Sequence, residues 1–123
     1  MLPITGTVAA LASVALVALS IPVSLQRMKV DTRIGMGSDP TLLRRIRAQG
    51  NFIEYVPLAL IVLALCEFRG VPAAWLYTIA ILLVLGRALH VAGMLTGVTP
   101  IRASGMLGTY GALLVGAAVL ALV

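Results

Sequence analysis

The sequence predicts an all-α fold, an integral membrane four-helix bundle formed by one domain over residues 1–123. The first reason is composition: 61% of the 123 residues are hydrophobic and only 11% are charged, against about 45–50% and about 25% in soluble domains. The second reason is that four apolar runs, at about 2–28, 41–68, 73–95 and 101–123, are each long enough to cross a bilayer. Glycine, proline and charged residues separate the runs and mark the turns.

The first span, 2–28, is expected to be an uncleaved helix. No charged residue precedes its apolar run, and the run is longer than the apolar core of a signal peptide. Gln26, Arg27 and Lys29 mark the water boundary at its end. The next segment, 31–40, is rich in glycine and charged residues and is expected to be a loop.

The second span, 41–68, is expected to begin in water. Asp39 followed by Pro40 is typical of an N-cap and the first turn of a helix. The first turns carry too many arginines for lipid, so the apolar part begins near Phe52. Pro57 lies inside that part and is expected to kink the helix, because proline cannot donate a hydrogen bond to the preceding turn.

The third and fourth spans carry fewer polar residues. Trp75 and Tyr77 lie near the start of the third span and are typical of an aromatic belt at the membrane interface. Arg87 and His90 share a helical face near its other end. The fourth span is the most lipid-like. It contains small residues at i, i+3 and i+6, which predict close helix packing: Gly105, Gly108 and Gly111.

Basic residues are unevenly distributed between the two ends of this bundle. Most flank the first connection, Arg87 and Arg102 flank the third, and the opposite end has only Arg69. The positive-inside rule then predicts that both termini lie on the non-cytoplasmic side. The net charge of +5 is therefore a topology signal, and we expect no nucleic-acid partner because the chain has little polar surface.

The sequence predicts neither a disulfide nor a metal site. Its one cysteine, Cys66, lies in an apolar run and is expected to be a small packing residue. The single histidine and the four acidic residues form no cluster with metal-ligand spacing.

The stretch 47–57 carries the strongest functional signal. It places Arg47, Asn51 and Glu54 at i, i+4 and i+7, on one helical face. Polar side chains at this depth must face a protein interior or a water-filled cavity, so we predict a polar ligand site at the membrane boundary. The topology gathers the following residues at that end: Arg27, Arg47, Gln49, Asn51, Glu54, Tyr55, Arg87, His90 and Arg102.

The charges of this set indicate the class of ligand. Arginine binds carboxylates through paired hydrogen bonds, and Glu54 suits an ammonium group, so a small zwitterion with more carboxylates than amines fits. Four short helices enclose few large pockets, which favours a site between subunits. Structural alternatives stay open: Glu54 could only neutralise Arg47 or Arg87, His90 could be a packing residue, and Arg102 could simply extend to the interface.

The stretch also resembles the signature of the MAPEG family, the membrane-associated proteins in eicosanoid and glutathione metabolism. The resemblance covers the whole chain, and runs 39–47 and 86–90 look most similar to small bacterial members. The matching residues keep the order and spacing of the signature: Arg47, Ala48, Gln49, Asn51, Glu54, Tyr55 and Pro57.

This resemblance implies a homotrimer in a bacterial inner membrane, with sites between subunits near the cytoplasmic face. It implies a transferase or peroxidase that uses glutathione as co-substrate and acts on lipophilic molecules that reach it through membrane lipids. Arg102, with Arg87, is the implied catalytic pair that stabilises the thiolate. The implied glutathione-binding residues are Arg27, Arg47, Gln49, Asn51, Glu54, Tyr55, Arg87 and His90. His90 and Met94 stand where eicosanoid-synthesising members have tyrosine, which argues against eicosanoid synthesis.

Two other functions remain as alternatives. One is a non-enzymatic oligomeric membrane protein that binds lipid headgroups, a small anion or a partner protein through its basic end. The other is a small transporter subunit, which is disfavoured because the polar residues cluster at one end and not near the midplane.

Overall fold

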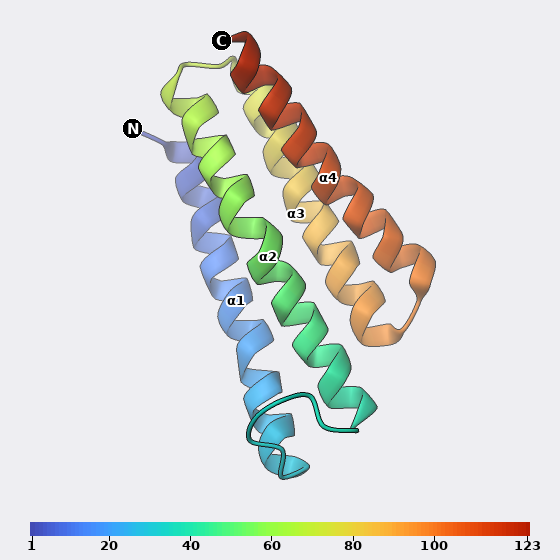
Figure 1. Cartoon of the computed structure of the whole chain (residues 1–123). Helices are drawn as coiled ribbons and strands as arrows, with labels where there is room; N and C mark the ends of the chain where they lie inside the picture. The colour runs from blue at the N-terminus through green and yellow to red at the C-terminus, as the bar shows by residue number, and fades with distance from the viewer.

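The computed structural model describes residues 1–123 as four helices that run alternately up and down. They are α1 (Pro3–Lys29), α2 (Pro40–Phe68), α3 (Ala73–Thr96) and α4 (Thr99–Leu122). Both termini lie at one end of the bundle, and the α1–α2 loop and the α3–α4 turn lie at the other (Figure 1). Each helix is long and apolar enough to cross a membrane, which confirms the predicted all-α architecture of four spans.

The helix ends follow the expected capping chemistry, with one difference. The Asp39 carboxylate accepts a hydrogen bond from the Leu42 N–H at 2.8 Å, as an N-cap should. Helix α2 continues through Pro57 to Phe68. Helix α4 begins at Thr99 rather than 101, because Pro100 lies in the first turn, where a missing N–H costs no intrahelical bond. Gly97 has a φ of 78°, which glycine adopts readily, and this permits the short turn between α3 and α4.

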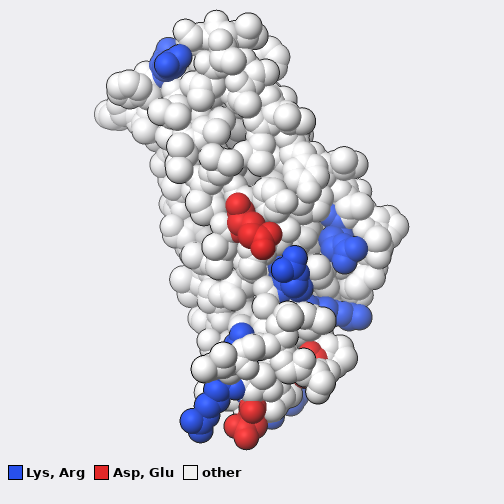
Figure 2. Space-filling view, in the orientation of Figure 1, with Lys and Arg blue, Asp and Glu red and all other residues white.

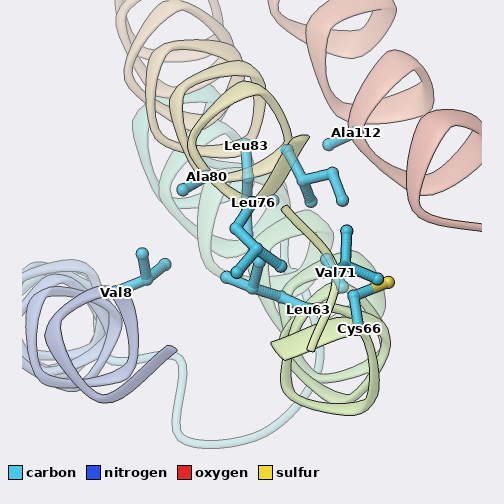
Figure 3. Packing of buried hydrophobic residues seen from close by; sticks show 10 residues of the cluster. Val8, Leu63, Cys66, Val71, Leu76, Ala80, Leu83 and Ala112 are labelled. Atoms are coloured by element: carbon cyan, nitrogen blue, oxygen red, sulfur yellow. The ribbon is translucent and has the colours of Figure 1, made fainter. Parts of the chain in front are cut away.

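The hydrophobic core lies between α2, α3 and α4, toward the end that carries the termini. Leu63 and Cys66 of α2 belong to one buried cluster with Leu76 and Leu83 of α3, while Val8 of α1 lies at the side of the cluster (Figure 3). Cys66 is fully buried, which confirms that it is a packing residue.

Helices α3 and α4 touch backbone to backbone. A Cβ atom added to Gly86 would lie 2.8 Å from the Thr109 backbone nitrogen, and one added to Gly105 would overlap the backbone of His90. Of the predicted glycine stripe, Gly105 and Gly108 meet the α3 backbone, whereas Gly111 meets only the side chain of Leu82. Small residues on both helices therefore permit this contact, as membrane helices commonly require.

Helix α1 is attached differently. It packs mainly on α2, touches α3 less and does not contact α4. At one end, the Glu67 carboxylate of α2 accepts the backbone N–H groups of Ile4 and Thr5 at 2.9 and 2.8 Å. At the other end, Gln26 donates to Asp39 at 2.9 Å. Between these ends, an apolar cavity of about 520 Å³ separates α1 from α3.

Candidate functional site

The basic residues gather at one end of the molecule. On the face shown in Figure 2, Lys and Arg lie mainly over the lower half, where Figure 1 shows the α1–α2 loop and the α3–α4 turn. The first and third connections are therefore at the same end, as the sequence predicted. Which side of the membrane this end faces stays a prediction.

A cavity of about 320 Å³ opens at this basic end, between the start of α2 and the α3–α4 turn. Arg44 and Arg47 of α2 line one side, and Arg102 of α4 lines the other. Gly93 forms part of the wall, and its lack of a side chain lets the α4 backbone approach at Arg102. No acidic residue lines the cavity, so it offers three cations to an anionic ligand.

Arg87 forms a second cationic group, buried between α2, α3 and α4. Its side chain is 5% exposed. Its Nε and Nη2 donate to the Thr109 hydroxyl at 2.9 and 2.6 Å, and its Nη1 donates to the Asn51 carbonyl oxygen at 2.5 Å. Nη2 also approaches the Met106 sulfur at 3.4 Å. Neutral acceptors therefore satisfy this buried cation, and its positive charge has no carboxylate partner within the chain.

Glu54 is exposed on the surface of α2 and is not among the partners of Arg87. The structural alternative, in which Glu54 only neutralises Arg47 or Arg87, is thus not seen within this chain. The carboxylate remains available to a ligand or to a second chain.

Two tyrosines lie beside Arg87. The rings of Tyr55 on α2 and Tyr110 on α4 pack edge to face with centroids 5.8 Å apart, and their hydroxyl oxygens are 3.5 Å apart. The guanidinium carbon of Arg87 lies 5.8 Å from the centroid of the Tyr55 ring, within the range of a cation–π interaction.

His90 lies between the two cationic groups along α3. It is only 2% exposed, and its Nδ1 has no hydrogen-bond partner. It follows Arg87 by three residues and precedes Gly93 by three, so the three share the face of α3 that packs on α4. His90 is therefore buried at the helix interface, and it does not line the arginine cavity.

Gln49 and Arg27 point away from this region. Gln49 donates to the Ser20 hydroxyl of α1 at 2.8 Å. Arg27 donates to the carbonyls of Thr32 and Gly35 at 3.3 and 2.6 Å, which fastens the α1–α2 loop. One chain thus separates the predicted residues into two sets. Arg47, Asn51 and Tyr55 of α2 lie toward α3 and α4, which carry Arg87 and Arg102. Gln49 points toward α1 instead, and Arg27 of α1 binds the α1–α2 loop.

Sequence reasoning missed three of the residues that shape the site, namely Thr109, Met106 and Arg44. Thr109 could have been found, because it stands one turn after Gly105 on the stripe that contacts the arginine-bearing helix α3. Arg44 is one of the basic residues that flank the first connection, and only the fold shows that it lines a cavity together with Arg102.

Comparison with known proteins agrees with this architecture. The chain is 31% identical over 111 residues to the inner membrane protein YecN of Escherichia coli strain K12, a match that covers 90% of this chain and 85% of that protein. The same protein from Escherichia coli O6:H1 matches equally well. No solved structure matches the chain significantly. The sequence profile described as "MAPEG family" matches residues 5–122, so this chain, with its four spans, belongs to the MAPEG family.

Proposed function

We propose that this protein is a membrane-bound transferase or peroxidase that uses glutathione and acts on lipophilic electrophiles. Membership of the MAPEG family supports this class of activity. The observation that carries the proposal is the cavity lined by Arg44, Arg47 and Arg102 without an acidic residue. Glutathione has two carboxylates, one ammonium group and a thiol, and an excess of cations suits such a ligand.

The residues divide the work of binding and chemistry. Arg47 and Asn51, with Tyr55, would hold the polar groups of glutathione, and the exposed Glu54 carboxylate would accept its ammonium group. A free thiol has a pKa of about 8.5, and a nearby cation lowers this pKa. Arg102 is the best-placed cation for this role, since it is exposed at the start of α4 and lines the cavity. Arg87 would contribute at a distance as a buried positive charge.

The site is proposed to lie between two copies of the chain. Gln49 points toward α1, and Arg27, itself on α1, binds the α1–α2 loop, whereas Arg47 and Asn51 lie on the side of α2 that meets α3 and α4. No single chain therefore gathers all the expected ligands. Adjacent copies in a closed ring would bring the α1 side of one chain against the α2–α4 side of the next. A homotrimer is the expected ring, and the mass of the detergent-solubilised protein would reveal it.

The location of the site suits two reactants of opposite polarity. The bilayer would supply the apolar electrophile, and water at the basic end would supply glutathione. The positive-inside rule predicts that this end is cytoplasmic. An inner membrane is the proposed location, because the relative YecN is named an inner membrane protein.

The thiolate itself provides the test. When the purified protein is titrated with glutathione, ultraviolet absorbance should reveal a thiolate in the wild type, and Arg102→Ala should lose most of this signal while its oligomeric mass stays unchanged. An undiminished signal would remove Arg102 from the role. Glu54→Gln should weaken glutathione binding, and unchanged affinity would leave Glu54 without a ligand-binding role.

A second candidate function is the non-enzymatic binding of an anionic lipid headgroup. The same arginine cavity favours it, because three cations without an acid would hold a phosphate as well as a carboxylate. Binding of phosphatidylglycerol with no detectable binding of glutathione would favour this function over the enzymatic one.

A further inference from the structure

Tyr55 and Tyr110 lie at an unusual depth for tyrosine in a membrane helix. At about 1.5 Å per residue, Tyr110 lies about 16 Å from the start of α4, near the middle of that helix. The ring of Tyr55 packs against it and therefore lies at the same depth. Tyrosine usually lies at the membrane interface, as Tyr77 does near the start of α3. A phenol at hydrocarbon depth needs a hydrogen-bond partner, because lipid tails supply none.

The two phenols do not fully supply that partner to each other. Their oxygens are 3.5 Å apart, which is longer than the 2.5–3.0 Å of a strong O–H···O bond. Tyr110 is 43% exposed on the outside of the chain, so its hydroxyl is accessible to another molecule. Both phenols therefore retain the capacity to donate to a third oxygen placed against them.

Arg87 strengthens this capacity. Its guanidinium lies over the Tyr55 ring and is fixed by Asn51 and Thr109, and Thr109 directly precedes Tyr110 in α4. A cation over the ring draws electron density from the phenol and favours donation from its hydroxyl. A fixed positive charge next to two donors is the arrangement that stabilises a developing oxyanion.

We infer that Tyr110, with Tyr55 beside it, donates a proton to the oxygen leaving group of the lipophilic substrate. The inference rests on the proposed glutathione-dependent function and names the group that protonates the leaving oxygen when the substrate is a lipid-soluble hydroperoxide or epoxide. Nothing else in the chain assigns a role to the exposed hydroxyl of Tyr110.

Reduction of a hydroperoxide uses two molecules of glutathione. The glutathione thiolate attacks the terminal oxygen, so that an S–O bond forms and the O–O bond breaks. The departing alkoxide takes the Tyr110 proton and leaves as the alcohol, and water returns a proton to the phenolate. A second glutathione then reduces the sulfenic acid and releases water and the disulfide. With an epoxide, a C–S bond forms, the ring C–O bond breaks, and the alkoxide takes the same proton.

The experiment compares two electrophiles on the full-length protein in detergent at saturating glutathione. Cumene hydroperoxide has a leaving oxygen that needs a proton, whereas chlorodinitrobenzene loses chloride, which needs none. Tyr110→Phe keeps the ring that packs on Tyr55 and removes only the hydroxyl. It should lower turnover of the hydroperoxide by about 100-fold, the lower end of the usual range for a general acid, because Tyr55 remains. Turnover of chlorodinitrobenzene should stay within about twofold of the wild-type rate.

Turnover of chlorodinitrobenzene also shows that the variant is folded. Tyr77→Phe, at the other end of the bundle, is a matched control that should change the rate with neither electrophile. Equal losses with both electrophiles, or no loss with either, would overturn the role of Tyr110 and leave the proposed function standing. A wild type that uses the chloride but not the hydroperoxide would also overturn it. A wild type that turns over neither electrophile would refute the proposed function itself.

Discussion

The α3–α4 pair and the α1–α2 pair are held together by opposite means. Helices α3 and α4 are in backbone contact along Gly86, Gly93 and Gly105. Helix α1 is fastened to α2 by side-chain hydrogen bonds near its ends, from Glu67 at one end and Gln26 at the other. An apolar cavity of about 520 Å³ remains between α1 and α3.

The difference shows where each kind of contact is useful in a membrane. Lipid tails are as apolar as leucine, so two helices gain little by covering apolar side chains, and close packing or hydrogen bonds must hold them. The glycine contact makes α3–α4 a rigid unit in which Arg87 can be buried. The hydrogen bonds near the two ends of α1 leave its middle free to pack against lipid or a second chain.

The largest effect is expected from filling the glycine contact. In Gly105→Ala the new methyl group would overlap the His90 backbone, which cannot move without shifting α3. We expect a loss of about 3 kcal/mol in the free energy of unfolding. Thermal unfolding in detergent measures it, and Gly6→Ala is the matched control because its Cβ would meet nothing within 4 Å. Equal stability of the two variants would show that α3 and α4 are not in contact as described.

Thr109→Val should have the next largest effect. Valine keeps the shape of threonine but removes the hydroxyl that accepts from Nε and Nη2 of Arg87, so a buried cation loses part of its solvation. The expected cost is about 2 kcal/mol, typical of hydrogen bonds to charged groups. Thr109→Ser retains the hydroxyl and should be closer to wild type in the same unfolding measurement. A valine variant as stable as the serine variant would contradict this role.

Glu67→Gln tests the attachment of α1 to α2. A glutamine has one acceptor oxygen where the carboxylate has two, so either Ile4 or Thr5 loses its partner. We expect a loss of about 1 kcal/mol, confined to the start of α1. Hydrogen exchange should accelerate at these two amides while the amides of α4 keep their rates. Faster hydrogen exchange throughout the chain would mean that the Glu67 hydrogen bonds stabilise more than the start of α1.

The smallest effect concerns pH. Hydrogen bonds from the Gln26 amide and the Leu42 N–H hold the pKa of the half-buried Asp39 carboxyl below its ordinary value of 3.8. A lowered folded-state pKa means that the stabilisation is present above about pH 3.8 and is lost as the pH falls through the folded-state value. Asp39→Asn remains an N-cap but cannot titrate. The stability difference between it and wild type should therefore shrink below about pH 3.8, and a constant difference would contradict this contribution.

The sequence alone predicted the four spans because their apolar runs are separated by Gly97, Asp39-Pro40 and similar strong breaks. It also predicted that Arg47 and Arg102 lie at one end, since alternating helices fix which ends meet. It could not predict that Arg87 bonds Thr109 or that Gln49 turns toward Ser20. Those contacts depend on the rotation of each helix about its axis, and α3 and α4 are so uniformly apolar that periodicity leaves this rotation undetermined.

The central claim, that this chain binds and activates glutathione, is tested most directly by isothermal titration calorimetry of the purified protein with glutathione, followed by a conjugation assay with chlorodinitrobenzene. We predict saturable binding that weakens in Arg47→Ala, together with turnover above the uncatalysed rate. Absence of any binding heat and of turnover at millimolar glutathione would contradict the claim and leave only the four-helix membrane fold.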